Sequence, residues 1–223
     1  MAPIKYYYYP EGAPNRAALL TIRNLNLEAE LIVVDLRKKE HLTEKFIKMN
    51  PQCCMPVLDD NGFILWESRA ISQYLVTTRA PRSSLYPTDP KMRAVVDARL
   101  FLDTTLHAVS RSFFYPIHSL GEKQIPELPK QRLYQLLGYL DHIMEGQKYV
   151  AGDELTIADF SILASFSTYF HAGANVSSLK NLMSWYKRCE SLVGFQENED
   201  EAKAFGKMLK SKLGIKNTWD ELQ

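Results

Sequence analysis

The sequence predicts an α/β N-terminal domain of βαβαββα order followed by an all-α C-terminal domain, a helical bundle. Two observations carry this prediction. Short aromatic and aliphatic runs alternate with helical patterns up to residue 80, which is typical of a mixed sheet covered by helices. Beyond a segment dense in proline and serine only helical periodicity remains. We therefore divide the chain into residues 1–80, a linker at 81–90, and residues 91–223.

Four strand signals and three helix signals define the N-terminal domain. The first strand is rich in aromatic residues, the second is a short apolar run, and the last two flank Asn61-Gly62, a strong hairpin signal. Pro14 suits the first turn of the helix after the first strand. The predicted strands are residues 3–9, 31–36, 55–59 and 63–66, and the predicted helices are residues 14–23, 40–49 and 68–77. This order is the thioredoxin-like arrangement.

Helices alone are predicted after the linker. The first is expected to run from residue 92 to about 119, with an end near Pro116, and the next from 128 to 145. Thr156 and Asp159 have the spacing of a capping box, which predicts a helix up to about residue 170. Another helix is expected at residues 179–189. The tail turns from acidic to basic, and we expect a solvated helix there.

Composition excludes several classes of function. A formal net charge of +1 on 223 residues favours no nucleic acid and no anionic membrane as partner. The sequence has no apolar run of about 20 residues and no signal peptide, so we expect a cytoplasmic protein. Its three cysteines suit a reducing compartment, and its five histidines lack metal-ligand spacing. We expect no metal.

Four segments in order along the chain resemble the cytosolic glutathione transferases, and they are most similar to the insect delta and epsilon classes. They are the opening strand and turn YYYYPEGAPNR (6–16), NPQCCMPVL (50–58), LWESRAI (65–71) and AGDELTIAD (151–159). The resemblance implies a homodimer that conjugates the thiol of glutathione to small hydrophobic electrophiles, as in detoxification of xenobiotics. It also implies that Phe101, Asp103 and Arg69 lie near the dimer interface. The alternative is a non-catalytic carrier of glutathione or apolar ligands.

The resemblance also implies a set of glutathione-binding residues. Met55 would bind the cysteinyl backbone of glutathione beside a cis-Pro56, as an added strand does. Ser68, at a helix N-terminus, would bind the γ-glutamyl carboxylate, and Glu67 the ammonium group. The remaining implied contacts are Gly12, Pro14, Gln52, Cys53 and Arg69. Delta and epsilon enzymes typically have His where this chain has Cys53. A thiol is a weak donor, so we expect the glycine end to bind more weakly or to be bound by Gln52 or Lys45.

A larger departure lies in the turn after the first strand. Delta and epsilon enzymes have a catalytic serine two residues before the proline of A-P-x-R, and this chain has Gly12 there. Four groups remain as candidates to stabilise the thiolate: the Tyr8 phenol, the Asn15 amide, the main-chain N–H of Gly12 or Ala13, and the His107 imidazole.

The second substrate is expected in an apolar cleft between the two domains. Its predicted walls are Tyr9, His107, Arg111, Phe114, Tyr115 and Phe170, with Pro14 beside them. Arg111 in such a setting indicates an acidic or polar group on the preferred ligand.

Overall fold

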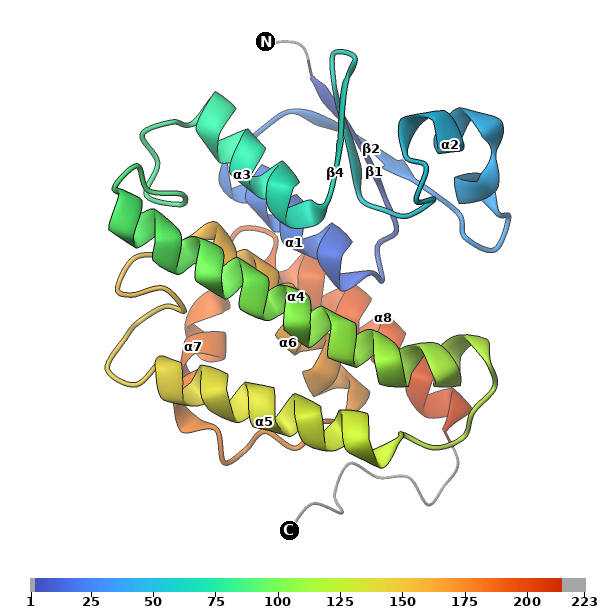
Figure 1. Cartoon of the computed structure of the whole chain (residues 1–223), viewed down its shortest axis with the longest axis vertical. Coiled ribbons are helices and arrows are strands. Elements are labelled where there is room, and N and C mark those ends of the chain that lie inside the picture. The colour runs from blue at the N-terminus through green and yellow to red at the C-terminus, as the bar shows by residue number, and fades with distance from the viewer. Residues whose placement is uncertain (1–2, 214–223) are drawn as a thin grey trace.

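A four-stranded mixed sheet forms the centre of the N-terminal part (Figure 1). The structure is a computed structural model and describes residues 3–213. Strands β1 (Ile4–Tyr8), β2 (Ala29–Val33), β3 (Val57–Asp60) and β4 (Phe63–Trp66) lie in the order β2-β1-β3-β4. β1 pairs parallel to β2 and antiparallel to β3, and β3 pairs antiparallel to β4. The predicted thioredoxin-like order is confirmed.

Helices cover both faces of the sheet. α1 (Ala13–Asn24) and α3 (Ser68–Arg79) pack on one face, and α2 (Glu44–Met49), after the short 3-10 turn η1 (Glu40–Leu42), packs on the other. The four tyrosines divide by strand alternation. Tyr6 is fully buried in the cluster shared with α1 and α3, where Tyr8 stacks on it, whereas Tyr7 belongs to the cluster around Phe46 of α2.

Between the linker and residue 213 the C-terminal part has five helices: α4 (Pro90–Ser119), α5 (Glu127–Ile143), α6 (Ile157–Ala172), α7 (Lys180–Cys189) and α8 (Phe195–Lys212). α6 is central and almost wholly buried, while α4 runs along the boundary with the N-terminal part (Figure 1). The predicted end of α4 at about residue 119 is confirmed, since the helix ends at Ser119. The expectation that Pro116 marks this end is wrong, because the helix continues through the proline. Within residues 3–213, none of the helices combines the length and apolarity that a membrane span requires.

The N-terminus of α6 is built around the buried carboxylate of Asp159. Its two oxygens accept hydrogen bonds from the main-chain N–H groups of Val150 and Thr156, at 2.9 and 2.8 Å, and from the Trp185 indole at 2.9 Å. The predicted capping pair therefore forms, and it also fixes α7 and the preceding loop.

The expectation of a solvated helix for the acidic part of the tail is wrong. α8 packs against α6, and Asn198 and Glu199 are buried there. Glu199 accepts from Ser167 at 2.6 Å and contacts the His171 imidazole. Burial raises the Glu199 pKa, but these hydrogen bonds outweigh it, so the pKa lies below its ordinary value. Charge pattern alone misleads here because the acidic side chain has buried partners on α6.

Arg16 joins the two parts of the molecule. Its side chain leaves α1, is 2% exposed, and donates to Asn198 Oδ1 at 2.8 Å, to Thr168 Oγ1 at 2.5 Å, and to the carbonyl groups of Asn198 and Ala164. Burial lowers its pKa to about 10, which still leaves the guanidinium charged at neutral pH. One α1 side chain thus fixes α1 against both α6 and α8.

Replacing Arg16 is predicted to destabilise the protein far more than replacing Arg23. Arg23 also bridges α1 to α8, through Glu197 at 2.9 Å, but both side chains are more than a third exposed. Arg16→Ala leaves several buried acceptors unpaired and should lower the free energy of unfolding by about 3–5 kcal/mol. Arg23→Ala should cost less than about 1 kcal/mol. Urea unfolding of both variants checks this, and equal losses would contradict it.

Candidate functional site

Three chain segments meet at one end of the sheet. Tyr7 of β1 pairs with Val57 of β3, and Val57 pairs with Trp66 of β4. The register therefore brings together the turn after β1, the Met55-Pro56 step before β3, and Glu67-Ser68 after β4. The Met55-Pro56 bond is cis. All the glutathione contacts expected in the N-terminal domain lie on these segments or on the residues that flank them.

The turn after β1 forms the N-terminus of α1. Gly12 is the N-cap residue, with extended backbone, and its N–H donates to the Tyr9 carbonyl at 3.0 Å. The Gly12 N–H is therefore already used within the turn. Ala13, as the first residue of α1, has one of the main-chain N–H groups that a helix leaves without an intrahelical acceptor. This N–H remains as a donor at the positive end of the helix dipole.

Asn15 is buried directly behind this turn, with 4% of its surface exposed. Its side-chain Oδ1 accepts from the Tyr9 N–H at 3.0 Å, and its main-chain carbonyl accepts from the Tyr6 hydroxyl at 2.6 Å. Because Oδ1 faces Tyr9, the Nδ2 amide group faces Gly12. Among residues 3–213, no acceptor forms a hydrogen bond with this Nδ2.

The N-terminus of α3 presents a second unpaired group. Ser68 is 2% exposed, and its hydroxyl has no hydrogen-bond partner among residues 3–213. Glu67, its exposed neighbour, has φ 73°, a conformation that is unfavourable for a residue with a side chain. A buried unpaired hydroxyl beside a strained residue is typical of a ligand site.

Arg69 makes its ion pair inside the chain. Its guanidinium contacts Asp103 of α4, which is 1% exposed and also accepts from Ser161 of α6 at 2.5 Å. One nitrogen of Arg69 and one oxygen of Asp103 are buried without partners in the part of the chain that the structure describes. The pair links α3 to the helical part of the molecule.

The loop before Pro56 is held by Asn50. This fully buried side chain donates to the Cys54 carbonyl at 2.8 Å and accepts from the Gln52 N–H at 3.0 Å. Cys53 has φ 54° and a half-buried thiol, whereas the Gln52 side chain is exposed. The loop thus holds Cys53 in an unfavourable backbone conformation beside the cis-proline.

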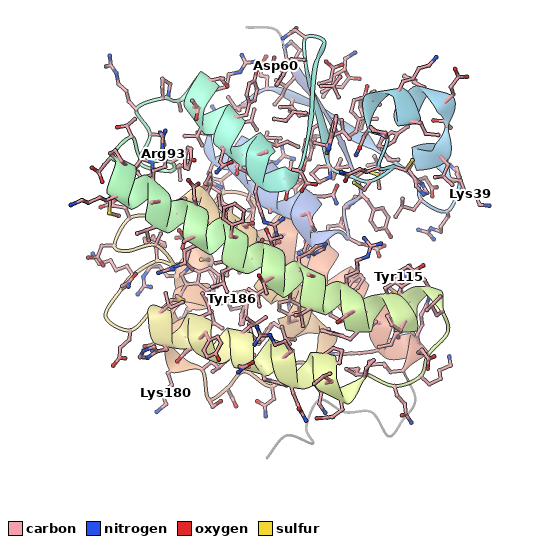
Figure 2. The ribbon with its side chains drawn as sticks, viewed as in Figure 1. Lys39, Asp60, Arg93, Tyr115, Lys180 and Tyr186 are labelled. Carbon is pink, nitrogen blue, oxygen red and sulfur yellow. The ribbon has the colours of Figure 1, made fainter. Side chains whose placement is uncertain are left out.

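A cavity of about 300 Å³ opens between the turn after β1, α4 and α8. Figure 2 marks Tyr115 on the C-terminal half of α4, which forms one wall. Seven residues expected in the glutathione or electrophile site line this cavity: Tyr9, Gly12, Pro14, His107, Arg111, Phe114 and Tyr115. Ala13, considered above for its main-chain N–H, lines it as well. The sequence reasoning missed six others, namely Glu11, Leu36, Ser110, His118, Thr168 and Phe205. One of them could have been found from the sequence, because the aromatic Phe205 is unexpected in a helix predicted to be solvated.

The structure does not bring Tyr8 and Phe170 to this cavity. Tyr8 lies on the other face of β1, against Tyr6, and lines a small cavity toward Glu197 and Arg23. Phe170 packs against Phe166 and Tyr186 inside the helical part.

Charged and titratable groups line the cavity on α4 and on the turn after β1. α4 contributes Arg111, His107 and His118, and the turn contributes Glu11. Burial lowers the pKa of His107, Asp103 opposes the change, and Arg69 and Arg111 reinforce it. Burial and the neighbouring Glu11 raise the pKa of Tyr9 to about 12. His107 is therefore neutral and Tyr9 protonated at neutral pH.

The comparisons with known proteins agree with this arrangement. The family model "Glutathione S-transferase, N-terminal domain" matches residues 2–77, and "Glutathione S-transferase, C-terminal domain" matches residues 103–198. Among solved structures, the unclassified glutathione S-transferase 2 of Bombyx mori is 42% identical, with a TM-score of 0.91 over 96% of this chain and 100% of that one.

Two further structures extend the comparison. A delta-class glutathione transferase of Nilaparvata lugens is 42% identical, with a TM-score of 0.90 over 94% of this chain and 100% of that one. A glutathione transferase homologue of Drosophila mojavensis with bound glutathione is 30% identical, with a TM-score of 0.88 over 96% and 99%.

The fold and the site define a two-part protein with a thioredoxin-like domain and a helical domain. The chain belongs to the glutathione S-transferase family, and its neighbours are insect enzymes of the delta, epsilon and unclassified groups. It is a glutathione transferase. The family uses glutathione as its co-substrate and is typically dimeric.

The His107 imidazole is predicted to titrate below about 6.5, the ordinary value for histidine. Arg111→Gln removes a cation that disfavours its protonation, so the midpoint should rise in that variant. NMR titration of the imidazole in both proteins measures the two midpoints. A wild-type midpoint above 6.5, or a fall in the variant, would show that burial and Arg111 do not set this pKa.

Proposed function

We propose that this protein conjugates the thiol of glutathione to small hydrophobic electrophiles, in detoxification of xenobiotics. One observation carries the proposal most directly. The buried Ser68 hydroxyl, which has no partner in the described part of the chain, and the apolar cavity lined by Gly12 lie on segments that the sheet register brings to one end. The first is suited to a polar tripeptide and the second to an apolar partner.

Glutathione binding would use the three segments together. Its γ-glutamyl carboxylate would accept from the Ser68 hydroxyl and from the N-terminus of α3, and the Glu67 carboxylate would accept from its ammonium group. The main chain of Met55, beside Pro56, would pair with the cysteinyl backbone. Gln52 and Cys53 are the proposed neighbours of the glycine end. In this pose the thiol points to Gly12 and Pro14.

Catalysis would then come from positioning and from stabilisation of the thiolate. The N-terminus of α1 favours a negative charge, and a thiol held there faces the cavity that would hold the electrophile. Phe114 and Tyr115 supply apolar surface, and Arg111 attracts an acidic or polar substituent on the electrophile. The thiolate sulfur forms the new bond to the electrophilic carbon, and the leaving group departs with the electron pair.

Carriage of glutathione or of apolar ligands without catalysis is the second candidate. It is favoured by Gly12, which supplies no hydroxyl at the end of the turn. Turnover of a chloronitrobenzene with glutathione separates the two functions. Conjugation that depends on enzyme concentration supports the transferase, whereas tight glutathione binding without conjugation supports the carrier.

We also propose that the protein acts as a cytoplasmic homodimer. Phe101 of α4 has 74% of its surface exposed in the single chain, which is unusual for an aromatic side chain. Asp103 lies two residues further on but is buried. In the proposed dimer its helix lies near the interface, but the Asp103 side chain does not contact the partner.

Ser68→Ala is predicted to weaken glutathione binding by about 10- to 100-fold, because it removes a buried donor to a carboxylate. Ser72→Ala is a matched control. Ser72 is equally buried one turn later on α3, but its hydroxyl accepts from Thr21 at 2.9 Å. Calorimetric titration with glutathione measures both affinities. A similar loss in both variants would mean that α3 is merely destabilised and that Ser68 has no ligand.

A further inference from the structure

In the turn after β1, the side-chain amide of Asn15 lies where a side chain at position 12 would begin. A Cβ atom added to Gly12 would stand 2.5 Å from Asn15 Nδ2 and 3.3 Å from the Tyr9 carbonyl oxygen. Real Cβ atoms do not approach a neighbour as closely as 2.5 Å. Any residue other than glycine at position 12 therefore requires the Asn15 amide to move.

Moving the Asn15 amide would cost free energy. Its Oδ1 accepts from the Tyr9 N–H at 3.0 Å, which fixes both the position and the flip of the group. Asn15 is also 4% exposed, and the Tyr6 hydroxyl binds its main-chain carbonyl. Glycine at position 12 and asparagine at position 15 are thus sterically coupled.

The orientation leaves one strong donor directed at the turn. Nδ2 has two N–H groups, and no acceptor among residues 3–213 binds them. The Gly12 N–H is used by Tyr9, and Tyr8 lies on the opposite face of β1. Beyond the main-chain N–H of Ala13, the remaining candidate is His107 of α4. Its lowered pKa leaves it neutral, so it could offer a thiolate a hydrogen bond but no positive charge.

We propose that Asn15 Nδ2 donates a hydrogen bond to the glutathione sulfur through the space left by the absent Gly12 side chain. The Gly12–Asn15 pair then performs the role that a serine hydroxyl at position 12 would perform. Asn15 is a catalytic residue in this arrangement, because its amide contacts the reacting atom. This inference rests on the proposed binding of glutathione.

The test measures the pKa of the glutathione thiol in its complex with the protein, from the ultraviolet absorbance of the thiolate at saturating glutathione. Asn15→Asp keeps the acceptor for the Tyr9 N–H but replaces the donor by a carboxylate. Asn15→Ala removes the donor and relieves the crowding at position 12. Both variants should raise the thiol pKa by about one to two units, which lowers the thiolate fraction, and with it conjugation, about 10- to 100-fold at a pH below the wild-type thiol pKa.

Two double variants isolate the steric coupling. Gly12→Ser with Asn15→Ala restores a hydroxyl in the vacated space, and Gly12→Ala with Asn15→Ala adds the same Cβ without it. We expect the first to return the thiol pKa to within about half a unit of the wild-type value and the second to leave it raised. In the presence of Asn15, either substitution at Gly12 should weaken activity, so the two positions are non-additive.

Two results would overturn the proposal. One is an unchanged thiol pKa in both single variants of Asn15 with glutathione still bound, which would assign the sulfur to Ala13 N–H or His107. The other is full activity of Gly12→Ser with Asn15 in place. Failure of the proposed function is distinguishable, because wild-type protein would then bind no glutathione or conjugate nothing.

Discussion

The buried guanidinium of Arg16 is the interaction on which the geometry of the site depends. It is one residue beyond Asn15, on the first turn of α1, and all its described hydrogen bonds go to α6 and α8. The same few residues therefore form the turn at the end of β1 and the contact with the helical part. A charged group buried without these acceptors would be strongly unfavourable, so the two parts have one relative position.

This arrangement explains why the cavity combines segments that are far apart in sequence. Its floor is the turn, its walls are α4 and α8, and α8 is held at the turn through Asn198, a partner of Arg16. The Arg69–Asp103 pair makes a second connection, from α3 to α4. The end of the sheet that carries Ser68 and the apolar cavity against the helices are thereby held in one relative position.

The sequence allowed much of this to be predicted, for reasons that are local. The hairpin at Asn61-Gly62, the capping pair of Thr156 and Asp159, and the alternating tyrosines of β1 are each specified by neighbouring residues. The errors concern contacts at long range. Glu199 was expected to be solvated because its partners on α6 are distant in sequence. Phe205 could not be assigned to the cavity because the other residues that line it are equally distant. Tyr8 and Tyr9 are adjacent in sequence, but of the two only Tyr9 lines the cavity between the turn, α4 and α8.

Phe114 belongs both to the wall of the cavity and to the aromatic core of the helical part. It lines the cavity but is only 6% exposed, and it packs against Phe113, Tyr169 and Phe205. A smaller residue there would enlarge the cavity and loosen the bundle at once. Arg111, Tyr115 and His118 are exposed on the same helix, so replacing them would not disturb the packing of the core. Divergence in substrate preference among relatives should therefore be concentrated at these three positions, while Phe114 changes only together with its aromatic neighbours.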